Sequence, residues 1–207
     1  MKKTYTINIS GTVFHIEDDA YNRLNSYISA LKQHFGDNDE GQEIVVDIEA
    51  RIAEIFKEKQ TPENQVIILT WVDEVIKTMG EPEEFEEQGE PGSTHQGKNR
   101  KRLYRDPDHK VMGGVCGGLA AYFNIDPVIM RLIFIFHFLI NGLGLLIYVI
   151  LWIAVPEAKT TAQRLEMRGE AVNIENIEKW IKKEYRDIES RVKKFNWGKK
   201  KAKEEKQ

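Results

Sequence analysis

The residues best suited to chemistry surround a single cysteine. Gly114-Val-Cys116-Gly-Gly118 has the G-x-C-x-G form of a nucleophile elbow, in which a thiolate at a strand-to-helix turn attacks a carbonyl group. An elbow needs a preceding strand and a histidine base, but residues 106–110 read Asp-Pro-Asp-His-Lys, which is not a strand pattern. The alternative is packing, because Gly113 with Gly117 and Gly114 with Gly118 form two G-x-x-x-G pairs that give a helix a flat face for close contact. We expect packing, and no catalytic residues.

The other reactive side chains do not form a recognisable site. None of the five histidines has metal-ligand spacing with another histidine or with Cys116. No phosphate-binding loop or paired carboxylates stand out, and the acidic runs are expected to be solvated faces. Residues 118–131 have the cadence of a helix-turn-helix, but the following helix is apolar apart from Arg131 and His137, so it offers little to base edges. We therefore expect no metal, cofactor or nucleic acid.

Charge is strongly segregated along the 207 residues, although the net charge is only −3. Residues 1–97 carry 8 basic and 20 acidic side chains, whereas residues 98–207 carry 22 basic and 13 acidic side chains. A basic second half favours a membrane or another acidic partner. The single cysteine fits a reducing compartment, and the first twenty residues contain no apolar run typical of a signal peptide. We therefore expect the N-terminus in the cytoplasm.

Residues 132–156 form one apolar stretch, which as a helix would measure roughly 37 Å at ~1.5 Å per residue, enough to cross a lipid core of ~30 Å. Asn141-Gly142-Leu143-Gly144 weakens a helix midway, so the stretch is either a single span or a re-entrant hairpin. Basic residues on both flanks favour a hairpin with both ends in the cytoplasm. The side chains expected at the membrane interface are those of Arg102, Arg105, Arg131 and Trp152.

The N-terminal region, residues 1–85, is predicted to be a small soluble α+β domain. Alternating residues indicate strands at 4–9 and 13–16 around a Ser10-Gly11 turn, and three helices with apolar faces come after them. Thr70 is the predicted cap of the third helix. Residues 86–102 are polar and rich in Gly, which predicts a flexible linker with a basic end.

Residues 158–197 are predicted to form cytoplasmic amphipathic helices, of which the second is capped by Asn173. Apolar positions of this helix recur at steps of three and four and form a seam that could pack on the N-terminal domain, lie on the membrane or form a coiled coil. Because about three heptads are marginal alone, we expect the seam to bind a partner. Residues 198–207 are predicted to be a basic, disordered tail. The seam consists of Ile174, Ile177, Ile181, Tyr185, Ile188, Val192 and Phe195.

The sequence between these two regions resembles the phage-shock-protein C (PspC) domain over about residues 101–157. The resemblance lies in Tyr104-Arg-Asp, Val111-Met-Gly-Gly-Val-Cys-Gly-Gly-Leu-Ala-Ala-Tyr-Phe, Ile125-Asp-Pro, Arg131-Leu-Ile-Phe and Ile147-Tyr-Val-Ile-Leu-Trp-Ile-Ala-Val-Pro-Glu. Residues 161–169 resemble the segment that comes after this domain in Bacteroidetes-type members, and the N-terminal domain is more distantly similar to small modules of bacterial membrane regulators.

This resemblance implies a protein of the bacterial cytoplasmic membrane that senses envelope stress and binds regulatory or effector proteins, and no catalytic residues carry over. We thus expect a mostly α membrane protein with a soluble α+β N-terminal domain, an apolar hairpin or single span in a PspC-like domain at 103–157, and an amphipathic C-terminal helix. Expected partners are the lipid bilayer, an unidentified regulatory or effector protein such as another phage-shock protein, and a second copy of the chain. The alternative is a structural membrane-binding protein without a signalling role.

Overall fold

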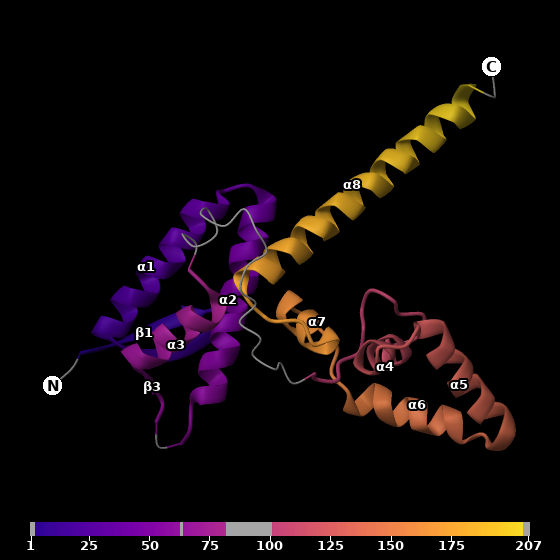
Figure 1. The fold of residues 1–207 in the computed structure, drawn as a ribbon, viewed down its shortest axis with the longest axis horizontal. Helices are drawn as coiled ribbons and strands as arrows, with labels where there is room; N and C mark the ends of the chain where they lie inside the picture. Colours follow the sequence, from indigo (N-terminus) through magenta and orange to yellow (C-terminus); the bar gives the residue numbers. More distant parts are fainter. Residues whose placement is uncertain (1–2, 63, 82–100, 205–207) are drawn as a thin grey trace.

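The computed structural model describes residues 3–62, 64–81 and 101–204, with the side chains of 141 and 194–204 excepted. The predicted linker therefore lies almost entirely outside the described residues. The chain is mostly helical and carries a small α+β region at its N-terminal end, as predicted (Figure 1). That region contains β1 (Thr4–Ile9), β2 (Thr12–Glu17), α1 (Asp18–Phe35), α2 (Asp39–Lys59), β3 (Val66–Ile67) and α3 (Leu69–Met79).

The three strands form one sheet in the order β1-β2-β3, in which β1 pairs antiparallel with β2 and β2 pairs parallel with β3. Ser10 and Gly11 both have positive φ, which is what a two-residue hairpin turn requires. The inward side chains of β2, Phe14 and Ile16, are buried against the helices, and Phe14 meets the Phe56 ring of α2 edge-on at 6.0 Å. The predicted hairpin is confirmed.

One predicted cap in this region is wrong. The third helix begins at Leu69 after the N-cap residue Ile68, and Thr70 lies within its first turn, so no side chain caps it. The third strand is limited to Val66 and Ile67, because only these two residues pair with β2.

The middle of the chain forms three apolar helices, α4 (Val115–Phe123), α5 (Pro127–Asn141) and α6 (Leu143–Ala154). Asp126 accepts a hydrogen bond from the backbone N–H of Val128 at 2.6 Å, and Pro127 occupies the first turn, so these two residues set the start of α5. Gly142, with φ of 69°, ends α5, and α6 packs back against it. A single continuous helix over 132–156 is therefore wrong, because the left-handed Gly142 backbone reverses the chain.

Two further helices complete the chain, α7 (Thr161–Arg168) and α8 (Ile174–Glu204). Gly169 ends α7 in a left-handed conformation. Asn173 accepts a hydrogen bond from the Asn176 N–H at 2.9 Å at the start of α8, so the predicted cap is confirmed. Residues 198–204, expected to be disordered, continue α8 to Glu204, and only 205–207 lie outside the described residues.

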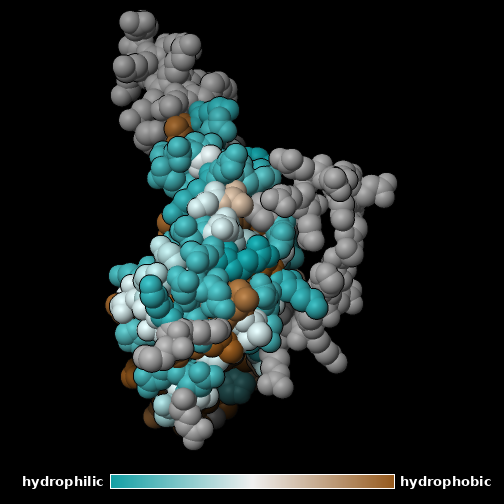
Figure 2. Space-filling view, turned by 90° about the vertical axis from the view of Figure 1, so that its left-hand side faces the viewer, coloured by the Kyte–Doolittle hydropathy of each residue, from teal (hydrophilic) through white to brown (hydrophobic). Residues whose placement is uncertain are grey.

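The C-terminal helices share the hydrophobic core of the N-terminal region instead of forming a separate unit. Ala162 and Leu165 of α7, Val172, and the first turns of α8 join one buried cluster with residues of the sheet and of α1, α2 and α3. Figure 1 shows α7 between this body and the hairpin, with α8 starting against α2 and then extending away. The face of the N-terminal body seen in Figure 2 is largely hydrophilic.

The seam of α8 is therefore divided. Ile174, Ile177 and Ile181 are at most 1% exposed in the chain's own core, with the Tyr185 side chain packed at its edge. Our prediction that these residues bind another protein is corrected, because α2 of the same chain already covers them. Further along, Ile188 and Val192 are 53% and 52% exposed, and the side chain of Phe195 is outside the description.

Candidate functional site

The hairpin of α5 and α6 is held together by a close backbone contact. A Cβ atom on Gly144 would lie 2.6 Å from the Phe134 carbonyl oxygen and 2.7 Å from the Phe138 nitrogen, so only glycine allows this approach. One turn further along α6, the Tyr148 ring meets the Phe134 ring edge-on with centroids 5.5 Å apart. Sequence reasoning treated Gly144 only as a helix breaker and missed this contact, although a small residue spaced within an apolar helix is a known packing signal.

The outward faces of the hairpin are apolar and uncovered. Leu139 is 75% exposed and Ile153 is 81% exposed, and they belong to a continuous set of large apolar side chains. Soluble monomers rarely expose contiguous apolar patches of more than a few hundred Å², so this surface marks an interaction site. The exposed set includes Leu132, Ile133, Ile135, Phe136, Phe138, Leu139, Ile140, Leu143, Leu145, Leu146, Ile147, Val149, Ile150, Trp152 and Ile153.

Within the described part of the chain, no single helix combines the length and the apolar character needed to cross a membrane. One bent pair, Val115–Phe123 with Pro127–Ile140, meets both criteria together, with a bend of 118° between its helices. The first member of this pair is largely enclosed by protein, since Val115, Cys116 and Ala120 are all buried.

The predicted helix face of four glycines is only half correct. Gly113 and Gly114 precede α4 in left-handed conformations, with φ of 62° and 78°, and so belong to a turn and not to a helix face. Gly117 and Gly118 lie in α4, but they face the extended segment 104–106 and not a second helix. A Cβ atom on Gly117 would lie 2.9 Å from the Cβ of Asp106, and one on Gly118 would overlap the Tyr104 carbonyl. Close packing is present, with a loop as its partner.

Arg105 closes the base of the hairpin. Its Nε donates to the Val155 carbonyl at 2.9 Å and its Nη1 donates to the Gly113 carbonyl at 2.7 Å. The backbone N–H of Arg105 also donates to the Pro156 carbonyl at 2.8 Å. The predicted interfacial role of Arg105 is therefore corrected: the side chain is 18% exposed and joins the two ends of the domain, because it donates to backbone carbonyls at both of them.

The other residues predicted at the interface have different surroundings. Arg102 forms an ion pair with Glu58 of α2 at 2.8 Å, so it contacts the N-terminal body. Arg131, near the start of α5, donates through Nη2 to the His109 carbonyl at 2.9 Å. Trp152 is 48% exposed and its ring lies against Gly113, which leaves an aromatic edge at the base of the hairpin.

A buried polar network connects the base of the hairpin to the N-terminal body. Glu166 of α7 is 6% exposed; its Oε1 lies 2.9 Å from Nη1 of Arg51 on α2, and its Oε2 accepts from the Tyr104 hydroxyl at 3.1 Å. Burial raises the pKa of Tyr104, which keeps this hydroxyl a donor. Nearby, the Thr161 N–H donates to Asp47 and the Gln163 amide donates to Glu54.

This network includes a polar stripe along one face of α2. Four polar residues of α2, at steps of four, three and four, face α7 and the start of the PspC-like segment: Asp47, Arg51, Glu54 and Glu58. Their helical spacing was a usable signal, but the sequence did not show which element would cover them.

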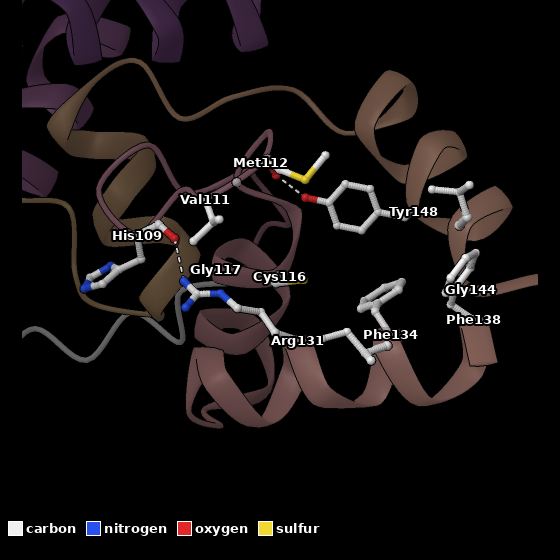
Figure 3. Close-up of a pocket in the computed structure, with 13 residues that line it drawn as sticks. His109, Val111, Met112, Cys116, Gly117, Arg131, Phe134, Phe138, Gly144 and Tyr148 are labelled. Atoms are coloured by element: carbon white, nitrogen blue, oxygen red, sulfur yellow. Dashed lines mark hydrogen bonds between the residues drawn. The ribbon is translucent and has the colours of Figure 1, made fainter. Parts of the chain in front are cut away.

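In the part of the chain that the structure describes, Cys116 has no histidine partner of the kind that a nucleophile elbow requires. It comes after a turn and lies in the first turn of α4, where it is 8% exposed. His109 pairs through Nδ1 with Asp106 at 2.9 Å, and Figure 3 shows its ring directed away from Cys116. Among the described residues, no hydrogen bond joins the two, and no group of three or more ligating side chains could hold a metal ion.

Neither a curated protein nor a solved structure matches the chain. The family model of the PspC domain matches residues 101–158, which begin at Lys101 and include α4, α5, α6 and the segment closed by Arg105. Proteins with this domain are typically membrane-associated, and the domain suggests a stress-response role of the phage-shock family. Residues 101–158 of this chain are therefore a PspC domain, set between an N-terminal α+β region and the helices that complete its core.

Proposed function

We propose that this protein is a non-enzymatic regulator of the envelope-stress response at the bacterial cytoplasmic membrane. Its hairpin inserts into the cytoplasmic leaflet, and the soluble body remains on the cytoplasmic side and passes the state of the membrane to a protein partner. The observation that carries this proposal is the apolar surface of α5 and α6, which is uncovered on both helices and would be stable only in lipid or against another apolar surface.

The length of the helices supports insertion into one leaflet. α5 has 15 residues and α6 has 12, which at ~1.5 Å per residue gives roughly 22 Å and 18 Å, short of a hydrocarbon core of ~30 Å. The turn at Gly142 would then lie inside the lipid. The backbone groups of the two helices are hydrogen-bonded within the hairpin, up to the turn itself.

The connections of the soluble parts support the same topology. The N-terminal region and α8 share one core, so the segments before and after the hairpin must lie on one side of the membrane. A single span would place them on opposite sides and would separate Ile174, Ile177 and Ile181 from the helices that bury them. The shared core thus favours the hairpin independently of the basic flanks.

Transmission to a partner is supported by the contacts at the base. A shift of α6 would act on Arg105 through Val155 and Gly113, and the neighbouring Tyr104 is bonded to Glu166 in the soluble body. The body carries the projecting end of α8, where Ile188 and Val192 are available to a regulatory or effector protein, another phage-shock protein or a second copy of the chain.

The topology is tested with single cysteines at two exposed positions in a Cys116→Ser background. Ser26→Cys on α1 and Ser190→Cys on α8 are labelled with an impermeant thiol reagent, first in intact cells and then after the cells are opened. We expect neither cysteine to react in intact cells and both to react after opening, because the shared core keeps both helices on one side of the membrane, which we propose is the cytoplasmic side.

Labelling of the α8 cysteine alone in intact cells would contradict the proposal and establish a single span. Recovery of the unlabelled protein in the soluble fraction would contradict membrane insertion itself. A cytoplasmic protein and a periplasmic protein with one exposed cysteine each provide the negative and positive controls for reagent access.

A further inference from the structure

A cavity of about 350 Å³ lies between α4, α5 and α6, within the range of ~300–1,000 Å³ typical of small-molecule sites. Figure 3 shows its walls: Phe134 and Phe138 come from α5, Tyr148 comes from α6, and Cys116 comes from α4. The Tyr148 hydroxyl donates to the Met112 carbonyl, so the polar atom of that side chain is already satisfied and its ring faces the cavity. The lining is therefore almost entirely apolar.

One end of this cavity carries a positive charge. The Arg131 guanidinium lies there and donates one hydrogen bond, to the His109 carbonyl. Arg102 and Arg105 both lie within 4 Å of a carboxylate, whereas no carboxylate pairs with Arg131 among the residues that the structure describes. A guanidinium has five N–H donors, so several remain for an anion.

The other end opens toward the lipid-facing surface. Phe138 lies seven residues beyond Arg131 on the same helix, or about 10 Å at ~1.5 Å per residue. Two residues of the lining, Ile135 and Leu145, are 54% and 57% exposed and also belong to the outer apolar faces. The cavity thus runs from a cation near the base of the hairpin to the apolar surface near its turn.

We propose that this cavity binds one anionic phospholipid, with its phosphate at Arg131 and one acyl chain lying along Phe134 toward Phe138. The proposal rests on the membrane insertion argued above. A planar guanidinium matches two phosphate oxygens, which suits Arg131 to this headgroup. An anionic lipid is favoured over a zwitterionic one, because the lining contains no carboxylate to pair with an ammonium group.

The test uses the full chain reconstituted into phosphatidylcholine vesicles that contain a photoreactive phosphatidylglycerol with a diazirine midway along one acyl chain. After illumination, mass spectrometry maps the crosslinked residues. We expect crosslinks on cavity residues such as Phe138 and Leu145. Arg131→Gln should lower their yield about tenfold, the order expected when a charge-assisted contact is lost. Lys110→Gln is the charge control, since Lys110 pairs with Glu157 and does not line the cavity.

A second pair of variants tests occupancy without removing the charge. Leu145→Trp places a bulky ring at the cavity lining, whereas Leu146→Trp adds the same ring at a neighbouring position that is 56% exposed and outside the lining. Crosslinking within the cavity should fall in the first variant and stay at the parent level in the second. Both lie on an exposed face, so neither should prevent folding.

Flotation of the same samples separates the two proposals. A protein that floats with the vesicles but crosslinks equally along the outer residues, with no effect of Arg131→Gln or Leu145→Trp, overturns the lipid site and leaves membrane insertion standing. Equal cavity crosslinking by a photoreactive phosphatidylcholine overturns the preference for an anionic headgroup. A protein that stays with the soluble fraction overturns both proposals.

Discussion

Gly118 lies in the first half of α4, where the chain at Tyr104 passes directly against the helix backbone. Glycine is required at this position because there is no room for a side chain. The backbone there is helical, a conformation that any residue could adopt. At Gly142 the demand is opposite: a Cβ atom there would have no neighbour within 4 Å, but φ is +69°. Gly118 is thus required for close packing, whereas Gly142 is required for its backbone conformation.

We predict that Gly118→Ala destabilises the protein by about 3 kcal/mol or more, because a methyl group must displace backbone atoms of residues 104–105. Gly142→Ala should cost only about 1–2 kcal/mol, the usual cost of a left-handed alanine. Denaturant unfolding of the purified protein in detergent micelles, followed by tryptophan fluorescence, measures both. Equal losses in the two variants would show that the approach at Gly118 is not tight.

At the scale of elements, α8 is one helix with two different tasks. Its first two turns complete the core of the N-terminal body, whereas beyond Tyr185 the same apolar repeat continues without a cover from the described chain. A helix whose apolar face extends past its own domain offers i, i+4 anchors to another apolar surface. Substitutions before Tyr185 should therefore affect the stability of the N-terminal body, and substitutions beyond Tyr185 should affect binding to another surface.

We predict that Ile188→Asp lowers the recovery of a protein partner about tenfold or more in crosslinking from native membranes. An isoleucine side chain buried at the interface contributes ~1.5–3 kcal/mol to binding, and its loss corresponds to a decrease of this size. Ser190→Asp adds the same charge on a different face of the helix and should have no effect. The melting temperature should be unchanged in both variants.

Ile181→Asp provides the contrast, because Ile181 is 1% exposed in the chain's own core and the variant should unfold the body. If Ile188→Asp and Ser190→Asp give equal recovery of the partner, the exposed half of the seam is not a binding surface.

At the scale of the whole molecule, the chain leaves the N-terminal body, forms the apolar hairpin, and returns to complete that same body. The core draws on residues from Ile9 to Ile181, so the PspC domain is inserted between two parts of one folded unit. Arg51, Tyr104 and Glu166, far apart in sequence, meet where the hairpin joins this unit. The hairpin is thereby joined to the body at a buried, charged contact.

We predict that a chain ended after Tyr185 keeps the stability of the soluble body, whereas one ended after Gly169 loses several kcal/mol. The shorter chain lacks Val172, Ile174, Ile177 and Ile181, and each buried side chain of this kind contributes about 1.5–3 kcal/mol. Amide hydrogen exchange of α2 measures the difference. Equal protection of α2 in both chains would contradict the shared core and, with it, the structural support for the hairpin topology.

Local sequence patterns were enough to locate most of the elements. Alternation and turn residues located β1 and β2, the Asn173 signal located the start of α8, and the combined motifs identified the PspC domain. These features depend on residues close in sequence, where capping, turn chemistry and side-chain period act directly.

Which surfaces meet was settled by long-range packing. The apolar spacing of the α8 seam could be recognised in the sequence. This spacing does not show that α2 covers Ile174, Ile177 and Ile181 and leaves Ile188 exposed. The partners of the polar stripe of α2 could not be identified from the sequence, because its ion pairs with Glu166 and Arg102 join residues that are far apart in the sequence. Burial depends on long-range neighbours, and a local pattern shows which face is apolar or charged but not what lies against it.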